Sequence, residues 1–228
     1  MLSKADHQRV HDAILAAEQA TSGEIFCVVA HESSPYRETP FAWAAAVALI
    51  APPLVLSFTG AGLLERLLGG AEQGWSTASA GGAINLTQVL LSYAVVQAGL
   101  FVAAFLIVAL PAARRLATPS RVKQSRVHAR ALEQFAHRAH ATEAQTGVLI
   151  YASLAERRVQ IIADEAIHKL AGAAAWDKAV AAALGPIGRG DTAGGLIEAI
   201  RICGQVLAEH RPALGERTSP PGGDVWEV

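Results

Sequence analysis

Residues 146–164 read TGVLIYASLAERRVQIIAD, and the rest of the chain is organised around this stretch. Two apolar runs, 148–151 and 159–162, flank the short charged connection at 155–157. The runs are rich in β-branched and aromatic residues, so the pattern predicts a β-hairpin. Because both runs are almost continuously apolar, we expect two central strands with both faces covered.

The N-terminal residues predict a helix followed by a strand. Ser3 and Asp6 have the spacing of a capping box at the start of a helix over 3–20. The stretch EIFCVVAH at 24–31 is expected to be a strand with a buried middle that joins the hairpin in one sheet. Helix followed by strand is typical of an α/β layer.

Helical periodicity returns on both sides of the hairpin. One helix is expected over 122–141, and a last long helix begins at Asp191 or Thr192, either of which is a suitable N-cap. Between them, a short helix is expected to close at Gly185 and Pro186. The expected core-facing residues are Leu132, Phe135, Ala136 and Ala139 on the first helix, and Leu196, Ile200, Cys203 and Leu207 on the last.

The composition indicates a soluble domain that carries a membrane segment. The chain has 228 residues, of which 52% are hydrophobic and 17% are charged. Its formal net charge of -1 argues against a general nucleic-acid binder, so no nucleic-acid partner is expected. Cys27 and Cys203 lie in separate apolar runs, and we interpret them as buried thiols in a reducing compartment. The N-terminal residues have no apolar core of a secretory signal.

Two long uncharged runs interrupt the domain. Residues 39–64 and 73–113 carry no Asp, Glu, Lys or Arg, and each run can cross a hydrocarbon core of about 30 Å. Phe41 and Trp43 lie at the start of the first run, where interfacial aromatic residues are common. The pattern predicts a two-helix transmembrane hairpin within residues 39–113. The alternative is a buried helical hairpin in a soluble protein.

Basic residues follow the second run and set the predicted orientation. The positive-inside rule places both termini and the globular domain in the cytoplasm, with two membrane spans. The same basic residues also suit contact with anionic lipid, and a topology signal alone is the alternative. The residues predicted to lie at the membrane surface are Arg114, Arg115, Arg121, Lys123 and Arg126.

The predicted organisation is therefore a domain split by an insertion. Residues 1–38 supply its first helix and strand, 39–113 the hairpin, and 114–212 its second part. Residues 213–228, with two prolines and two glycines in a row, are expected to be a disordered tail.

Several short stretches, taken in order, resemble the TPM domain, also described as the thylakoid-lumen phosphatase-like family. They are TSGEI at 21–25, TGVLI at 146–150, RRVQIIAD at 157–164, and GD at 190–191 before AGGL at 193–196. The chain is most similar to the small bacterial, membrane-anchored members with a hairpin inside the domain. The resemblance implies an α/β/α sandwich, interrupted by that hairpin, at the bacterial inner membrane.

For function, the resemblance implies several activities. Relatives are linked to photosystem repair, to an auxiliary subunit of a receptor, to weak acid phosphatase activity and to calcium binding. Many relatives carry an acidic or amide residue directly before the glycine of the second strand, whereas this chain has Thr146 there.

A small acidic constellation is the candidate metal site. Asp164 and Glu165 end the second strand of the hairpin, and Asp191 precedes the last helix. Strand ends and helix N-termini in α/β layers are common ligand positions, and such carboxylates suit Ca²⁺ or Mg²⁺. The alternative is structural: Asp191 is a helix N-cap and Asp164 forms a turn.

Two functions remain open. The first is a non-enzymatic adaptor at the inner membrane, in contact with the lipid bilayer and a membrane-protein partner during assembly or quality control. The second is a divalent-metal-dependent phosphatase that uses Asp164 and Asp191. The chain contains no G-x-S-x-G, GxxxxGK[ST], HExxH or CxxC motif.

Overall fold

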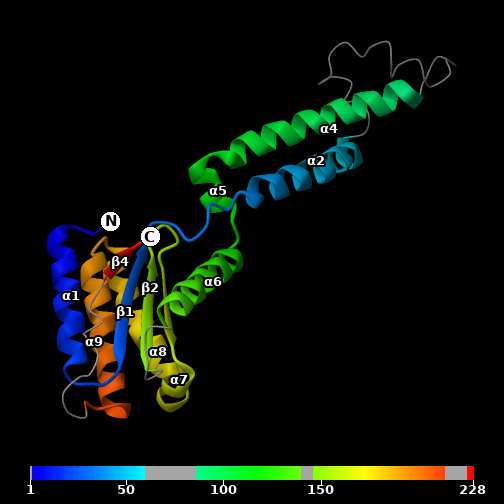
Figure 1. Ribbon diagram of the computed structural model, residues 1–228. Helices are drawn as coiled ribbons and strands as arrows, with labels where there is room; N and C mark the ends of the chain where they lie inside the picture. Colours follow the sequence, from blue (N-terminus) through cyan, green and yellow to red (C-terminus); the bar gives the residue numbers. More distant parts are fainter. Residues whose placement is uncertain (1, 60–85, 140–145, 214–224) are drawn as a thin grey trace. The chain divides into compact units, whose positions relative to one another are not determined.

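The computed structural model describes residues 2–59, 86–139, 146–213 and 225–228, and it has a mixed α/β fold. One four-stranded sheet has the order β3-β2-β1-β4 (Figure 1). β1 pairs in parallel with β2 and with β4, whereas β2 and β3 form the expected antiparallel hairpin. The strands are β1 (Glu24–Ala30), β2 (Gly147–Ser153), β3 (Arg158–Ala163) and β4 (Val225–Glu227).

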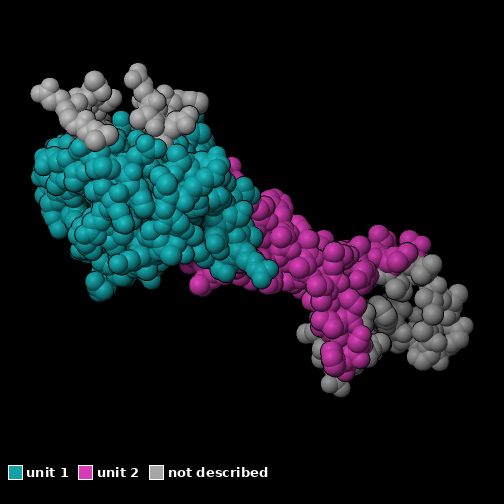
Figure 2. Space-filling view, turned by 90° about the horizontal axis from the view of Figure 1, so that it is seen from below, with its two compact units in different colours: residues 1–35, 120–228 teal, residues 36–119 magenta. Residues whose placement is uncertain are grey.

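The chain divides into two compact units (Figure 2). Unit 1 comprises Met1–Pro35 and Ser120–Val228, and unit 2 comprises Tyr36–Pro119. The corresponding boundaries predicted from the sequence lie after residues 38 and 113. Unit 2 also takes in the short helix α5 (Pro111–Ala117), which follows the second uncharged run.

Helices cover both faces of the sheet in unit 1 (Figure 1). Ile25, Cys27 and Val29 of β1 face a core shared with α1 (Lys4–Glu18), α8 (Ala173–Gly188) and α9 (Thr192–His210). The alternate residues Phe26, Val28 and Ala30 face a smaller core shared with α6 (Ser120–Ala139). Successive side chains of a strand point to opposite faces, so one apolar strand supplies both cores.

The first and last long helices of unit 1 form as predicted. Ser3 and Asp6 make a complete capping box at the start of α1. The predicted stripe of α9, Leu196, Ile200, Cys203 and Leu207, is buried. α1 and α9 lie close together at Gly204. A Cβ added there would lie 2.7 Å from the Cβ of Ala17. Gly172, with φ +74°, separates α7 (Glu165–Ala171) from α8.

Four expectations about unit 1 are wrong. β3 is an edge strand rather than a central one. On α6, Val127 and Ala131 reach the core together with the predicted Phe135, whereas the predicted Leu132 and Ala136 are exposed. α8 continues through Pro186 to Gly188. In the predicted disordered tail, Val225–Glu227 forms the strand β4, which is ordered by backbone pairing with β1. Residues 214–224 of that tail lie outside the described part of the chain.

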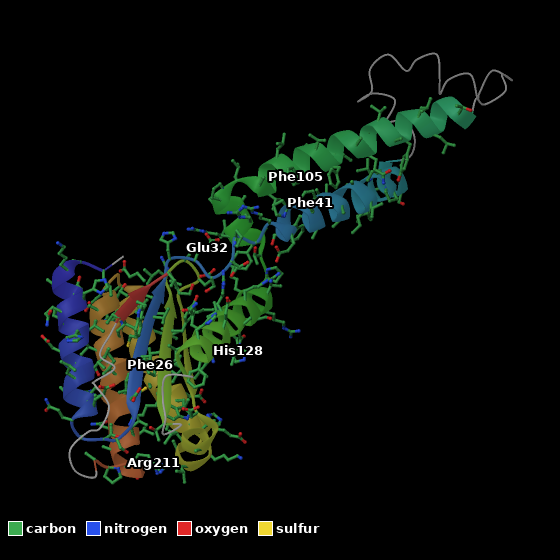
Figure 3. All side chains as sticks on the ribbon, in the orientation of Figure 1. Phe26, Glu32, Phe41, Phe105, His128 and Arg211 are labelled. Atoms are coloured by element: carbon green, nitrogen blue, oxygen red, sulfur yellow. The ribbon has the colours of Figure 1, made fainter. Side chains whose placement is uncertain are left out.

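Unit 2 contains α2 (Glu38–Thr59), α4 (Leu86–Ala109) and α5. The rings of Phe41 on α2 and Phe105 on α4 lie 4.8 Å apart and point toward one another (Figure 3). Trp43 Nε1 donates a hydrogen bond to the carbonyl oxygen of Ala117 at 3.0 Å. These contacts join the helices into one unit. Residues 60–85, which complete the predicted hairpin, lie outside the described residues.

Among the residues that the structure describes, one helix is long and apolar enough to cross a membrane, at Glu38–Val55 within α2. A second candidate arises only if Tyr93–Ala109 and Pro111–Ala117, which meet at 98°, are counted as one bent span. This test uses length and composition alone, so the two-span transmembrane hairpin stays a prediction.

Candidate functional site

A buried polar network lies where the parallel strands β1 and β2 end. The two strands are in register up to Ala30 opposite Ser153, so their carboxyl ends meet at one edge of the sheet. Ser33 follows β1, Tyr151 and Ser153 close β2, and Glu156 lies in the turn to β3. Ligand sites of α/β proteins gather at such strand ends, so this edge is the candidate site.

The side chains of the network are linked in a continuous series. The Ser33 and Tyr151 hydroxyl oxygens are 3.1 Å apart, and Ser33 Oγ donates to Ser153 Oγ at 2.8 Å. Ser153 Oγ then donates to Glu156 Oε2. Because the hydrogen of Ser33 is used toward Ser153, Tyr151 is left as the donor to Ser33. The series therefore runs in one direction and ends on a carboxylate.

Backbone and basic groups complete the network. Both carboxylate oxygens of Glu156 accept from the amide of Ser33 at 3.3 Å. Arg130 of α6 donates through Nε to the carbonyl oxygen of Ser33 at 3.4 Å and through its terminal nitrogen to Glu133 at 2.7 Å. The hydrogen bond that Arg130 donates to Glu133 raises the pKa of Arg130. Burial raises the pKa of Tyr151, although its hydrogen bond with Ser33 acts in the opposite direction.

The network is closed to reagents from outside. Tyr151, Ser153 and Ser33 are 1%, 1% and 3% exposed, and their hydroxyl groups bond to one another. A serine beside a carboxylate is the pairing of a nucleophile with a base, but here the serine hydroxyl faces no open space. The arrangement instead fastens the segment after β1 to the hairpin turn, since removing one partner would leave buried polar atoms unsatisfied.

A cavity of about 540 Å³ adjoins the hairpin turn along the edge strand β3. α6 contributes Gln124 and Val127, and α8 contributes Asp177, Val180 and Leu184. From the turn and β3 come Glu156, Arg157, Arg158, Val159 and Gln160. Among the described strands, β3 pairs with β2 alone, so its outer backbone groups face this side. Open strand edges flanked by helices accept extended peptide segments.

Arg157, at the rim of this cavity, has an uncommon backbone conformation. Its φ is +50°, in the left-handed region that glycine usually occupies. The Arg157 amide donates to the Leu154 carbonyl oxygen at 3.2 Å and closes the turn of the hairpin. A left-handed residue after such a turn fits the twist of the two strands. The turn thus holds the Arg157 side chain at the cavity.

The structure does not bring the predicted metal ligands together. Asp164 Oδ2 accepts from the Gly147 amide at 2.8 Å, and Glu165 pairs with Lys169 at 2.6 Å. Asp191 caps α9 by accepting from the Gly194 amide at 2.8 Å. Within the described ranges, no three His, Cys, Asp or Glu side chains are placed to hold a metal ion. Each of the three carboxylates has a local structural partner instead.

The predicted membrane-surface residues fall on two helices. Arg114 and Arg115 lie on α5 in unit 2, and Arg121, Lys123 and Arg126 lie on α6 in unit 1. Arg115, Arg121 and Arg126 are exposed, whereas Arg114 and Lys123 are half-buried.

Sequence reasoning missed the buried network. Tyr151 and Ser153 alternate on one face of β2, and their polar atoms at the end of an apolar strand were the available signal. Ser33 and Glu156 carry no such signal. They come together only because β1 and β2 pair in register across the insertion.

No protein-family model and no curated protein sequence matches the chain. The chain is similar in fold to the NMR structure of BA42 protein from the psychrophilic bacterium Bizionia argentinensis, with a TM-score of 0.54. The two are 16% identical in sequence, and the match covers 100% of this chain and 96% of that one. At this identity the likeness supports the mixed α/β fold and nothing about activity.

Proposed function

We propose that this chain is a membrane-anchored binding protein: unit 2 enters the bilayer, and unit 1 recruits a partner protein during membrane-protein assembly or quality control. The observation that carries the proposal is the apolar surface of unit 2. Outside unit 2, the exposed large apolar side chains of the described residues are Leu132, Leu170, Leu184 and Val228. Those of α2 and α4 include Phe41, Trp43, Leu49, Ile50, Leu54, Phe58, Leu90, Leu91, Val95, Val102, Leu106 and Ile107.

Such a surface is unfavourable in water. Leu49 is 63% exposed, Val95 71% and Phe58 87%, on helices that carry no charge after Glu38. Covering apolar surface gains about 25 cal/mol per Å², and contiguous exposed apolar patches mark contact with membranes or proteins. A helix that is apolar all round suits a lipid environment. Lipid is therefore the proposed cover for the outward faces of α2 and α4.

The proposed orientation follows from the charges that flank the apolar runs. Arg114, Arg115, Arg121, Lys123 and Arg126 follow the second run, and the positive-inside rule assigns such residues to the cytoplasm. Both parts of unit 1 then lie on the cytoplasmic side of a bacterial inner membrane. We further propose that unit 1 is a TPM-like α/β/α sandwich, as the short stretches that resemble that family suggest.

The recruiting role rests on the surface of unit 1. The cavity along β3 is lined by the edge strand, by two glutamines and by charged side chains of both signs. Such a lining suits a polypeptide segment better than a small apolar ligand. A binding role also fits the residues that the phosphatase hypothesis invoked, Asp164 and Asp191, because each supports a local backbone turn.

The test has two arms. Flotation with liposomes measures anchoring: the parent chain is expected to float with the vesicles, and a chain recovered in the protein fraction would contradict insertion. Affinity capture from detergent-solubilised membranes measures recruitment, with Asp177→Arg at the cavity and a span-scrambled chain as controls. A partner retained by the parent and lost with Asp177→Arg supports the proposal. Equal capture by all three chains overturns it.

A further inference from the structure

The C-terminal strand β4 is a short segment docked on the outer edge of β1 (Figure 1). Val225, Trp226 and Glu227 lie opposite Cys27, Val28 and Val29 in parallel register. The pairing extends one residue further, because the Val228 amide donates to the Val29 carbonyl oxygen at 3.0 Å and the His31 amide donates to Val228 at 3.2 Å. β4 thus occupies an edge of the sheet that an extended strand can fill.

Each of the three side chains of β4 lies in a different environment on this edge. Val225 packs against the core shared with α1 and α9, and Trp226 packs against the opposite core. The Trp226 ring lies 6.2 Å from the ring of Phe26, tilted by 41°. Glu227 Oε1 accepts from the Leu2 amide at 2.6 Å and lies 3.3 Å from His7 Nε2. The edge therefore takes an aliphatic, an aromatic and an acidic residue in that order.

The acidic position has a basic environment. Leu2 directly precedes the N-cap of α1, where backbone amides favour negative charge. Lys4, His7 and His11 of α1 line a cavity of about 340 Å³ beside Val225. A carboxylate in this position accepts from the Leu2 amide and lies beside His7, whereas a basic side chain could not accept that hydrogen bond.

β4 is paired to the sheet over fewer residues than the other strands. It pairs over three residues with one strand, and each of the three is half-exposed. Short edge elements with few buried contacts open locally at low free-energy cost. The Phe26 ring, the Leu2 amide and the backbone edge of β1 then become accessible together.

We propose that the outer edge of β1 is a strand-docking site that Val225–Glu227 fills in the free protein, and that a partner's extended segment of the order aliphatic–aromatic–acidic replaces it. The partner strand pairs in parallel with β1 and places its aromatic ring on Phe26 and its carboxylate on the Leu2 amide. This inference rests on the proposed binding function and adds a second site to it, at the edge of the sheet opposite the cavity along β3. Because Val225–Glu227 belongs to the same chain, it competes with the partner segment for the β1 edge at an effective concentration on the order of millimolar.

A peptide experiment on the full chain in detergent solution tests this site. The probe is a fluorescently labelled peptide with the sequence of residues 222–228, and its binding is followed by anisotropy. Trp226→Ala in the protein weakens the resident strand, so the probe is expected to bind this variant at least about tenfold more tightly than the parent. Leu170→Ala, which removes an exposed apolar side chain from α7, is the matched control and should bind as the parent does.

A probe with alanine in place of its tryptophan should lose at least about tenfold in affinity, because it cannot contact Phe26. A chain that ends at residue 223 gives a second route if Trp226→Ala does not fold. Equal binding of the probe to parent and weakened chains, or no binding to either weakened chain at about 1 mM, overturns the proposal. Anisotropy does not depend on liposome flotation, so failure of membrane anchoring and failure of this site are separate results.

Discussion

Glu156, in the turn between β2 and β3, binds the backbone amide of Ser33 with both carboxylate oxygens at 3.3 Å. The two residues are 123 positions apart, and the whole of unit 2 lies between them in the sequence. This contact therefore joins the two pieces of unit 1 directly. Unit 2 is an insertion into the α/β unit, and the folding of unit 1 depends on contacts made across that insertion.

Removing the charge of Glu156 should weaken this joint. Glu156→Gln keeps the shape of the side chain but loses the charge-assisted hydrogen bonds to Ser33 and Ser153. We expect a loss of about 1.5–3 kcal/mol in the free energy of unfolding, measured by thermal unfolding in detergent solution. Glu198→Gln is the control, because Glu198 is half-exposed and pairs with Arg201 at the surface of α9; it should change stability by about 0.5 kcal/mol or less. Similar losses in both variants would refute the joint.

The framework of unit 1 was predictable because local signals agree with its global fold. The capping box at Ser3, the apolar run of β1 and the stripe of α9 each satisfy their own local rule and also meet in one core. β4 was not predictable. Val225, Trp226 and Glu227 follow a stretch of tail composition, and only the register with Cys27, Val28 and Val29 makes them a strand.

Because α1 and α9 lie close together, we expect Gly204→Ala to lower the free energy of unfolding. In Gly204→Ala the new Cβ would lie 2.7 Å from the Cβ of Ala17, so the helices must move apart. Overpacking costs about 1–3 kcal/mol and outweighs the helix-propensity gain of about 1 kcal/mol. Adding Ala17→Gly should recover part of the loss, as a double-mutant cycle would measure. Gly188→Ala, with no atom within 4 Å of the new Cβ, is the control and should not destabilise.

The two buried thiols predict an alkaline loss of stability. Burial raises the pKa of Cys203 to about 12 and also raises the pKa of Cys27. Folded thiols then keep protons that unfolded thiols lose above about pH 8.5. Their contribution is complete below that pH and declines as the pH rises toward the folded pKa, by about 1.4 kcal/mol per pH unit for each thiol. Unfolding measurements from pH 8 to 10 should show a shallower decline in Cys203→Ala, and an unchanged slope would contradict this origin.

A charge on the outward face of α2 should interfere with membrane insertion. Leu49 is 63% exposed near the middle of α2. Leu49→Lys is expected to raise the free energy of insertion by about 3 kcal/mol and to lower the fraction that resists carbonate extraction from membranes. Leu132→Lys makes the same change on α6 of unit 1, where the leucine is 45% exposed, and should leave this fraction unchanged. Equal extraction of both variants would mean that α2 does not face lipid.

The predicted metal-site carboxylates were only partly interpretable from the sequence. Asp191 was predicted either as a metal ligand or as an N-cap, and the structure places it as the cap of α9. Asp164 and Glu165 bond to groups near them, so residue type alone did not identify a metal centre. The contact between Ser33 and Glu156 was not predicted, because it depends on the register of β1 and β2. That register is a long-range property that no local sequence pattern contains.

The side of the membrane on which each piece of unit 1 lies tests the central claim most directly. Cys27 and Cys203 are buried, so single cysteines introduced at the exposed positions Asp12 and Arg211 would dominate labelling by a membrane-impermeant maleimide. We predict that both positions label in inside-out vesicles and that both are protected in right-side-out vesicles until detergent is added. Labelling of the two positions from opposite sides would contradict an α/β unit whose two pieces come together on one side of the membrane.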